Sequence, residues 1–307
     1  MIEALLAPEL LRGVGAGALG LALVAAAAAA TRRNDRPTVP LAGLVLAAAS
    51  LTALGLRLAP PRTVILGIGL LAVAGLLADV WPSCRPALPL LALPGAALVA
   101  TDPELAAGPP WLMGLLVLTV VLGGPLVGSF DERWSDRGYG PVLMAGTVAG
   151  VYLTVPDTER LLVVLGVAGV LALTGWPRPV AHLGWAGSLA ATGLVLWAAA
   201  LDGASRPSAV VGSMACLGLL AVEPVARALL RDRGGPLDPL AGSWLALPVV
   251  AAAHALVVVV ASRGAGLRSD LPTAAAVAGA DLGIALVLCL AVGLVFGARP
   301  SQPAGHG

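Results

Sequence analysis

The stretch VVAAAHALVVVV, from Val249 to Val260, is an apolar run typical of a membrane-spanning helix, and it contains one titratable side chain, His254. The rest of the chain has a similar composition. Of its 307 residues, 58% are hydrophobic and 11% are charged, and the mean hydropathy is +0.94. Soluble domains are about 45 to 50% apolar. The sequence therefore predicts an all-α integral membrane protein, a bundle of transmembrane helices.

The apolar segments predict the number of spans. A helix needs about 20 mainly apolar residues to cross a bilayer, with a usual minimum of about 17. The fourth and sixth segments fall below that minimum, and each of them either crosses the bilayer fully or is re-entrant. We therefore expect about eleven spans, within a range of nine to twelve. No connection is long enough for a packed extramembrane domain. We expect one membrane domain, residues 1–307, with a disordered tail at 301–307. The predicted spans are 9–30, 40–58, 63–82, 87–101, 111–128, 141–156, 161–177, 184–201, 208–228, 243–262 and 274–297.

The distribution of arginine predicts the orientation, because cytoplasmic loops hold an excess of basic residues. All 18 basic residues are arginines. With eleven spans and the N-terminus outside, eleven of them fall on the cytoplasmic side and seven on the other. Without the fourth span the excess would lie outside. We therefore expect the C-terminus in the cytoplasm.

Composition also excludes several classes of function. The net charge of +1 indicates no nucleic-acid partner. Without lysine, the chain cannot form a Schiff base. Cys84, Cys216 and Cys289 are widely separated and form no zinc or disulfide pattern, so we expect no metal and no cofactor. No specific catalytic motif is present. Heavy use of Ala, Gly, Arg and Pro is typical of a GC-rich bacterial genome, which predicts a multi-pass protein of the bacterial plasma membrane.

Ionisable residues within apolar segments are the first places to look for function in a membrane protein. In the predicted topology His254 lies about 16 Å from the cytoplasmic end of its span, and Asp281, on the next antiparallel span, lies at a similar depth. Two interpretations follow from this shared depth. The two side chains form a polar clasp between helices, or they form a protonation site for coupled transport.

Two other features concern helix geometry. Gly123, Gly124 and Pro125 interrupt the fifth span and suggest a broken helix, which in transporters exposes backbone groups to substrate. Glu223 precedes Arg227 by four residues, a spacing that favours a salt bridge along one helix face.

The densest charged segment is the predicted cytoplasmic loop FDERWSDRGYGP. Carboxylates beside arginines can hold a divalent metal and a phosphate, as an enzyme acting on lipid-linked substrates requires. The alternative is a solvated loop of mutual ion pairs. The residues concerned are Asp131, Glu132, Arg133, Asp136 and Arg137.

Three functions remain open. The preferred one is a small transporter or flippase-like translocator of a hydrophobic or lipid-linked substrate. The second is a non-catalytic subunit or scaffold of an envelope-assembly complex. The third is a membrane transferase that uses the Asp131–Arg137 loop. The expected partners are the lipid bilayer and, for a subunit, other envelope membrane proteins.

Overall fold

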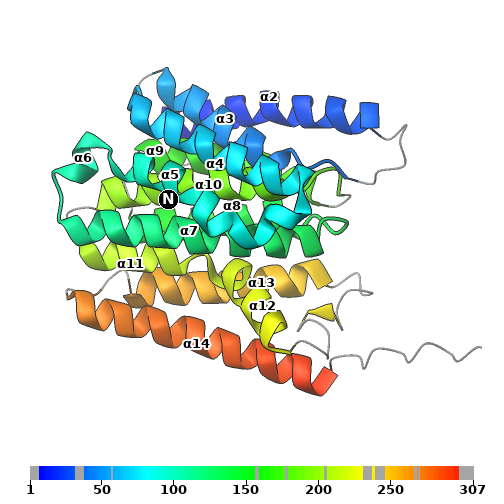
Figure 1. Ribbon diagram of the computed structural model, residues 1–307, viewed down its shortest axis with the longest axis vertical. Helices are drawn as coiled ribbons and strands as arrows, with labels where there is room; N and C mark the ends of the chain where they lie inside the picture. Colours follow the sequence, from blue (N-terminus) through cyan, green and yellow to red (C-terminus); the bar gives the residue numbers. More distant parts are fainter. Residues whose placement is uncertain are drawn as a thin grey trace, which may run out of the picture.

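The computed structural model describes residues 7–31, 38–56, 58–155, 159–176, 179–203, 206–230, 237–238, 246–265, 268 and 270–296. These residues are almost entirely helical and include no strand beyond an isolated bridge between Val39 and Ala181. Figure 1 shows the long helices side by side along a common direction, with α2 and α14 at opposite edges. The predicted tail at 301–307 lies outside the described residues.

The bounds of the helices are as follows. The first half of the chain forms α2 (Pro8–Thr31), α3 (Ala42–Gly55), α4 (Arg62–Val80), the 3-10 helix η2 (Pro82–Ala87), α5 (Leu88–Ala100), α6 (Pro103–Ala106), α7 (Pro110–Arg133) and α8 (Tyr139–Thr154). The second half forms α9 (Glu159–Leu171), the 3-10 helix η3 (Ala172–Thr174), α10 (Gly184–Gly203), α11 (Pro207–Ala215), α12 (Gly218–Leu230), α13 (Ala246–Val260), the π-helical turn η5 (Ala261–Ala265) and α14 (Leu271–Phe296).

Proline sets the start of several of these helices. Pro110 and Pro207 occupy the first turns of α7 and α11, where the missing amide hydrogen breaks no intrahelical bond. Pro82 begins η2, which continues into α5, so that residues Pro82–Ala100 form one apolar segment of 19 residues. The fourth predicted span therefore begins earlier than residue 87 and is not short.

Among the described residues, seven helices are long and apolar enough to cross a membrane, or up to eight if the bent pair α11 and α12 is one span. These long apolar helices indicate a membrane-embedded protein. Each of the eleven predicted segments coincides with helix, but α3 has 14 residues, α8 has 16 and α9 has 13. Eleven complete crossings thus stay a prediction, as does the orientation of the termini.

Helix α10 lies at the centre of the bundle. In its apolar segment, Gly184–Leu201, 94% of the residues are buried, and the helix packs against α3, α4 and α7. Small residues allow this packing: a Cβ atom added at Gly187 would overlap the backbone of Gly43 on α3. Gly13 and Gly17 play the same part between α2 and α9, because a side chain at either would press on the backbone of α9.

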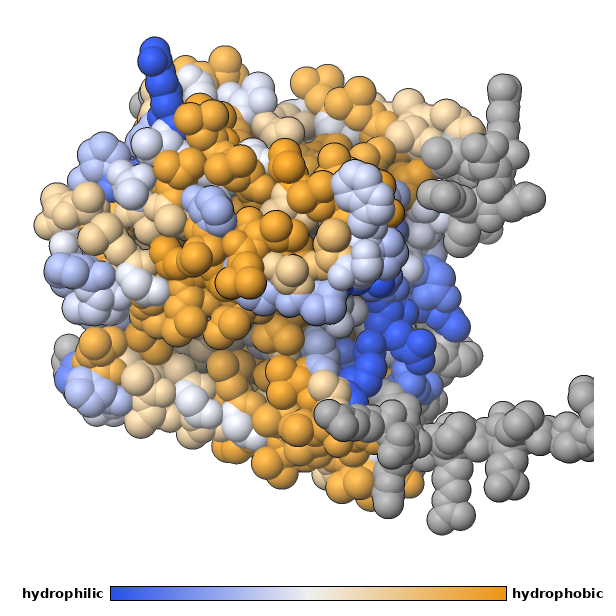
Figure 2. All heavy atoms as spheres, in the orientation of Figure 1, coloured by the Kyte–Doolittle hydropathy of each residue, from blue (hydrophilic) through white to orange (hydrophobic). Residues whose placement is uncertain are grey.

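Polar side-chain contacts mark the two ends of the bundle. The last turns of α4 and α7 meet the start of α10 at one end, through Asp79 and Asp131. At the other end, Asp102 after α5 accepts a hydrogen bond from Trp197 near the end of α10, and Glu104 pairs with Arg160 at the start of α9. Figure 2 shows hydrophilic residues gathered toward one end of the helices and apolar residues over much of the flank. This distribution fits a bilayer around the flank.

Candidate functional site

A sharp bend separates α11 from α12. The two helices meet at 55° across Cys216 and Leu217, and α12 begins at Gly218 with a φ of +46°, a conformation that favours glycine. A Cβ atom at this position would also lie 3.1 Å from His254 Nδ1. We call residues 216–218 the α11–α12 break. The ninth predicted span is therefore interrupted within an apolar region.

His254 lies against this break and is 1% exposed. Its Nε2 atom is 3.0 Å from the carbonyl oxygen of Leu143 and 3.1 Å from Thr147 Oγ1, both on α8. A carbonyl can only accept, so Nε2 carries the hydrogen. In the neutral ring, Nδ1 is then a bare acceptor, and it has no hydrogen-bond partner among the described residues. It is one of several buried polar atoms without a partner among the described residues, and it lies against the α11–α12 break.

Asp281 belongs to the buried stripe of α14 and is 9% exposed. Helix α14 packs on both α11 and α12, and the Asp281 carboxylate is close enough to Cys216 in the break for electrostatic interaction. Its Oδ2 atom has no partner among the described residues. No hydrogen bond or ion pair joins Asp281 to His254 in the described part of the chain. Each of the two instead approaches the same break from its own helix, so the predicted clasp is not present.

A cavity of about 330 Å³ adjoins the break. Its lining is almost wholly apolar, and the Thr119 hydroxyl in its wall already donates to the carbonyl of Leu115. Helices α7, α11, α12 and α14 contribute the lining, which includes Gly123, Met214, Leu217, Gly218 and Gly279. The cavity therefore combines an apolar surface with a helix break.

The predicted interruption at Gly123, Gly124 and Pro125 is wrong as to its position. Helix α7 runs unbroken from Pro110 to Arg133 through these residues. The glycines instead permit close packing: a Cβ atom at Gly123 would lie 2.8 Å from Leu217, and one at Gly124 would lie 2.6 Å from Leu189. Proline costs α7 one backbone hydrogen bond, a loss that packing against neighbouring helices can compensate. The broken helix is α11–α12, and Gly123 lies in the wall of the adjoining cavity.

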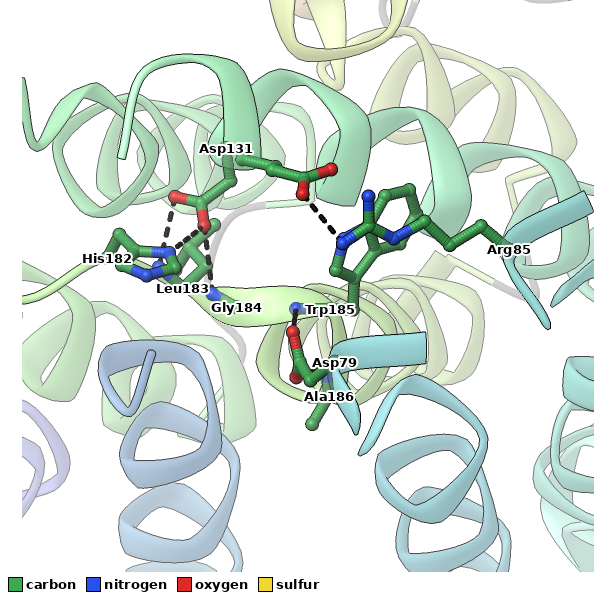
Figure 3. A network of polar contacts seen from close by, with 9 residues as sticks. Asp79, Arg85, Asp131, His182, Leu183, Gly184, Trp185 and Ala186 are labelled. Carbon is green, nitrogen blue, oxygen red and sulfur yellow. Dashed lines mark hydrogen bonds and ion pairs between the residues drawn. The ribbon is translucent and has the colours of Figure 1, made fainter. Parts of the chain in front are cut away.

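Two carboxylates, the buried Asp131 and the half-buried Asp79, cap the start of α10 (Figure 3). Asp131 is 1% exposed and accepts hydrogen bonds from the amides of Leu183 at 3.0 Å and Gly184 at 2.8 Å. Its Oδ2 atom is also 2.8 Å from His182 Nδ1. Asp79 accepts from the next two amides, those of residues 185 and 186, at 3.2 and 3.1 Å. We call Asp79, Asp131, His182 and the first turn of α10 the capping network.

Both carboxylates of the capping network satisfy amides that have no partner within α10. They also place negative charge at the positive end of the helix dipole. Arg85 covers this network: its guanidinium lies 5.4 Å from the ring centroid of Trp185 and pairs with Glu132 at 2.7 Å. The arrangement explains how a central apolar helix can begin below the surface of the bundle.

The segment predicted as a charged loop begins within the last turn of α7, and most of its charged side chains pair with other parts of the chain. Asp131 caps α10, Glu132 pairs with Arg85, and Arg133 donates to both oxygens of Asp238 at 3.1 Å. Only Asp136 and Arg137 pair within the loop, at 3.7 Å. The ion pairs are mostly with other segments rather than mutual. No group of three or more His, Cys, Asp or Glu side chains suited to a metal lies among the described residues.

The predicted ion pair between Glu223 and Arg227 is confirmed. Glu223 is fully buried on α12, and its second carboxylate oxygen, Oε2, has no partner among the described residues. The pair lies toward the end of the bundle that holds the capping network, because Asp238 and Arg133 lie within electrostatic range of Glu223. The pair lies further along α12 than the break, and neither residue lines the cavity.

Sequence reasoning missed the capping roles of Asp79, Asp131 and His182. A signal was available: the residues before α10 are His182 and Leu183, so α10 has no Ser, Thr, Asp or Asn at its own N-cap. A long buried helix without a local cap must receive one from elsewhere in the chain.

The chain matches no protein-family model, no curated protein and no solved structure.

Proposed function

We propose that this protein is a translocator of a hydrophobic or lipid-linked substrate, and that the α11–α12 break and its cavity form the substrate site. The single observation that carries this proposal is the unpaired Nδ1 atom of His254, buried against Gly218 where the helix is broken. Broken helices with polar groups near the middle of the bilayer are the usual construction of transporter sites.

The charge and lining of the site support this choice of substrate class. An apolar cavity of about 330 Å³ is near the lower limit of ligand pockets and suits part of an apolar molecule. His254 Nδ1 and Asp281 Oδ2 are two buried acceptors without partners in the described chain, and a substrate that donates hydrogen bonds would satisfy them. The apolar cavity thus lies beside two unpaired polar atoms, although neither His254 nor Asp281 is among the residues that line it.

The transferase hypothesis receives less support. Two of its three carboxylates, Asp131 and Glu132, are engaged by Arg85, His182 and the amides of α10. A scaffold role requires neither the helix break nor the adjoining cavity. We place the translocator in the bacterial plasma membrane, with the capping network on the cytoplasmic side.

The test is lipid movement in vesicles that contain the purified protein. Two probes are used, a fluorescent phosphatidylglycerol and a fluorescent polyprenyl phosphate, with a membrane-impermeant quencher added outside. The wild-type protein is expected to expose probe from the inner leaflet. If neither probe moves, and deletion of the gene changes no envelope lipid, the proposal is wrong.

Two histidine variants separate transport from folding. His254→Gln keeps a donor for the Leu143 carbonyl but removes the atom at the Nδ1 position, whereas His254→Asn does the reverse. Loss of one buried hydrogen-bond partner costs about 1 to 3 kcal/mol, so His254→Gln is expected to slow transport roughly tenfold or more. Ser188→Ala removes an unpaired buried hydroxyl on α10, away from the break, and serves as the matched control. Equal rates in wild type and His254→Gln would contradict the assignment.

A further inference from the structure

The cavity at the break opens on the flank of the bundle rather than at either end. Leu118 and Leu122 of α7 line it and are 54% and 51% exposed. On the other side Gly279 of α14 lines it, and a Cβ atom added there would meet nothing within 4 Å. Helices α7 and α14 thus form the two lips of a cleft whose floor is the α11–α12 break. We call it the α7/α14 cleft.

The depth of the cleft along both helices places it in the hydrocarbon region. Thr119, at the middle of its α7 wall, lies about 14 Å from the start of that helix. Its α14 wall, Ala278 to Leu282, lies about 10 to 16 Å from the start of α14. The hydrocarbon core is about 30 Å thick, so both walls lie near its middle. The opening therefore faces lipid chains and not water or headgroups.

We propose that the α7/α14 cleft is the lateral opening through which an apolar chain of a membrane lipid reaches the break. The residues that line the cleft offer almost no polar surface to a water-soluble ligand, and Leu118 and Leu122 of its α7 lip are exposed. Asp281, whose Oδ2 atom has no partner in the described chain, lies on α14 between the lining residues Ala278 and Leu282. Asp281 therefore lies at the same depth along α14 as the cleft.

This inference rests on the proposed function, because it names the class of substrate and the side from which it arrives. It also makes a claim that does not depend on transport: a lipid chain is held in the cleft in preference to the rest of the apolar flank. Binding and movement can therefore be measured separately.

The experiment uses the full-length protein in vesicles of phosphatidylglycerol and phosphatidylcholine. A small fraction of the phosphatidylglycerol carries a diazirine near the middle of one acyl chain. After irradiation, the labelled residues are mapped by mass spectrometry. Label is expected to concentrate on Leu115–Gly123 and Ala278–Leu282 and to fall when unlabelled phosphatidylglycerol is added.

Two glycine variants on α14 supply the decisive comparison. Gly279→Trp fills the cleft, whereas Gly283→Trp adds the same side chain one turn away, where a Cβ atom also meets nothing within 4 Å but no cavity is lined. Displacing about two methylene groups lowers affinity roughly tenfold, so label on the cleft should fall by that factor in Gly279→Trp only. Label spread evenly over the exposed flank, or equal in the two variants, would overturn the inference.

The fluorescent-lipid assay distinguishes the two proposals. Concentrated label without lipid movement supports the cleft and contradicts the translocator. Lipid movement with evenly spread label overturns the lateral opening and leaves the translocator in place.

Discussion

Replacement of Asp131 by alanine should destabilise the whole bundle, because this carboxylate holds the start of the central helix. It accepts three hydrogen bonds, from His182 and from the amides of Leu183 and Gly184. Hydrogen bonds to a charged group contribute about 1.5 to 3 kcal/mol each. Water can reach His182, whose side chain is partly exposed, so the sum is reduced. We expect Asp131→Ala to cost about 3 to 5 kcal/mol, the range for removing one member of a buried pair.

Two further variants test the cause of this loss. Gly140→Ala leaves the carboxylate in place but adds a methyl group that would overlap Asp131 Oδ1, and it should therefore also destabilise the protein. Asp136→Ala is the control: this side chain is 62% exposed and pairs loosely with Arg137, so its loss should cost no more than about 0.5 kcal/mol.

The assay is thermal unfolding of the detergent-solubilised protein, followed by tryptophan fluorescence. A loss of 3 to 5 kcal/mol corresponds to a fall in Tm on the order of 10 °C for a chain of this size. A Tm for Asp131→Ala within a degree or two of wild type would refute the capping role, as would an equal fall in Asp136→Ala.

Three other predictions concern packing and polar contacts. Arg85→Ala removes the ion pair with Glu132 and the contact with the Trp185 ring. Because Arg85 is partly exposed, we expect the free energy of unfolding to fall by about 1 kcal/mol, and added salt should make this difference smaller. Asp102→Asn weakens the acceptor for Trp197 Nε1, which should cost about 1 to 3 kcal/mol and shift the tryptophan emission spectrum. Gly166→Leu would force α2 away from α9, so protease cleavage within α2 should become faster than in wild type at equal detergent concentration.

The helical class and the limits of most helices could be predicted from the sequence, because apolar length alone determines which segments can cross a bilayer. The Glu223–Arg227 pair could also be predicted, since i,i+4 spacing fixes the geometry within one helix. Contacts between helices could not be predicted in this way. Asp131 and His182 are 51 residues apart, and no local pattern indicates that they meet.

The candidate site shows the same division. His254 and Asp281 were singled out because buried ionisable residues are costly in lipid. Their depths predicted a direct clasp, but depth says nothing of the angle at which two helices face one another. The position of the break was also misjudged. Pro125 is accommodated within α7, whereas the break lies between α11 and α12, where Gly218 adopts a positive φ at the start of α12. Glycine alone does not reveal from sequence which conformation it adopts.

The flank of the bundle is expected to lie in the bilayer, with its two ends facing opposite aqueous compartments. Single cysteines at positions 136 and 104 test this arrangement directly, in a variant whose native cysteines are replaced by serine. Asp136 and Glu104 are both exposed and lie beyond opposite ends of α7. In intact cells, a membrane-impermeant thiol reagent should label the cysteine at 104 and spare the one at 136 until the membrane is permeabilised. Labelling of both positions, or of neither, in intact cells would contradict the account.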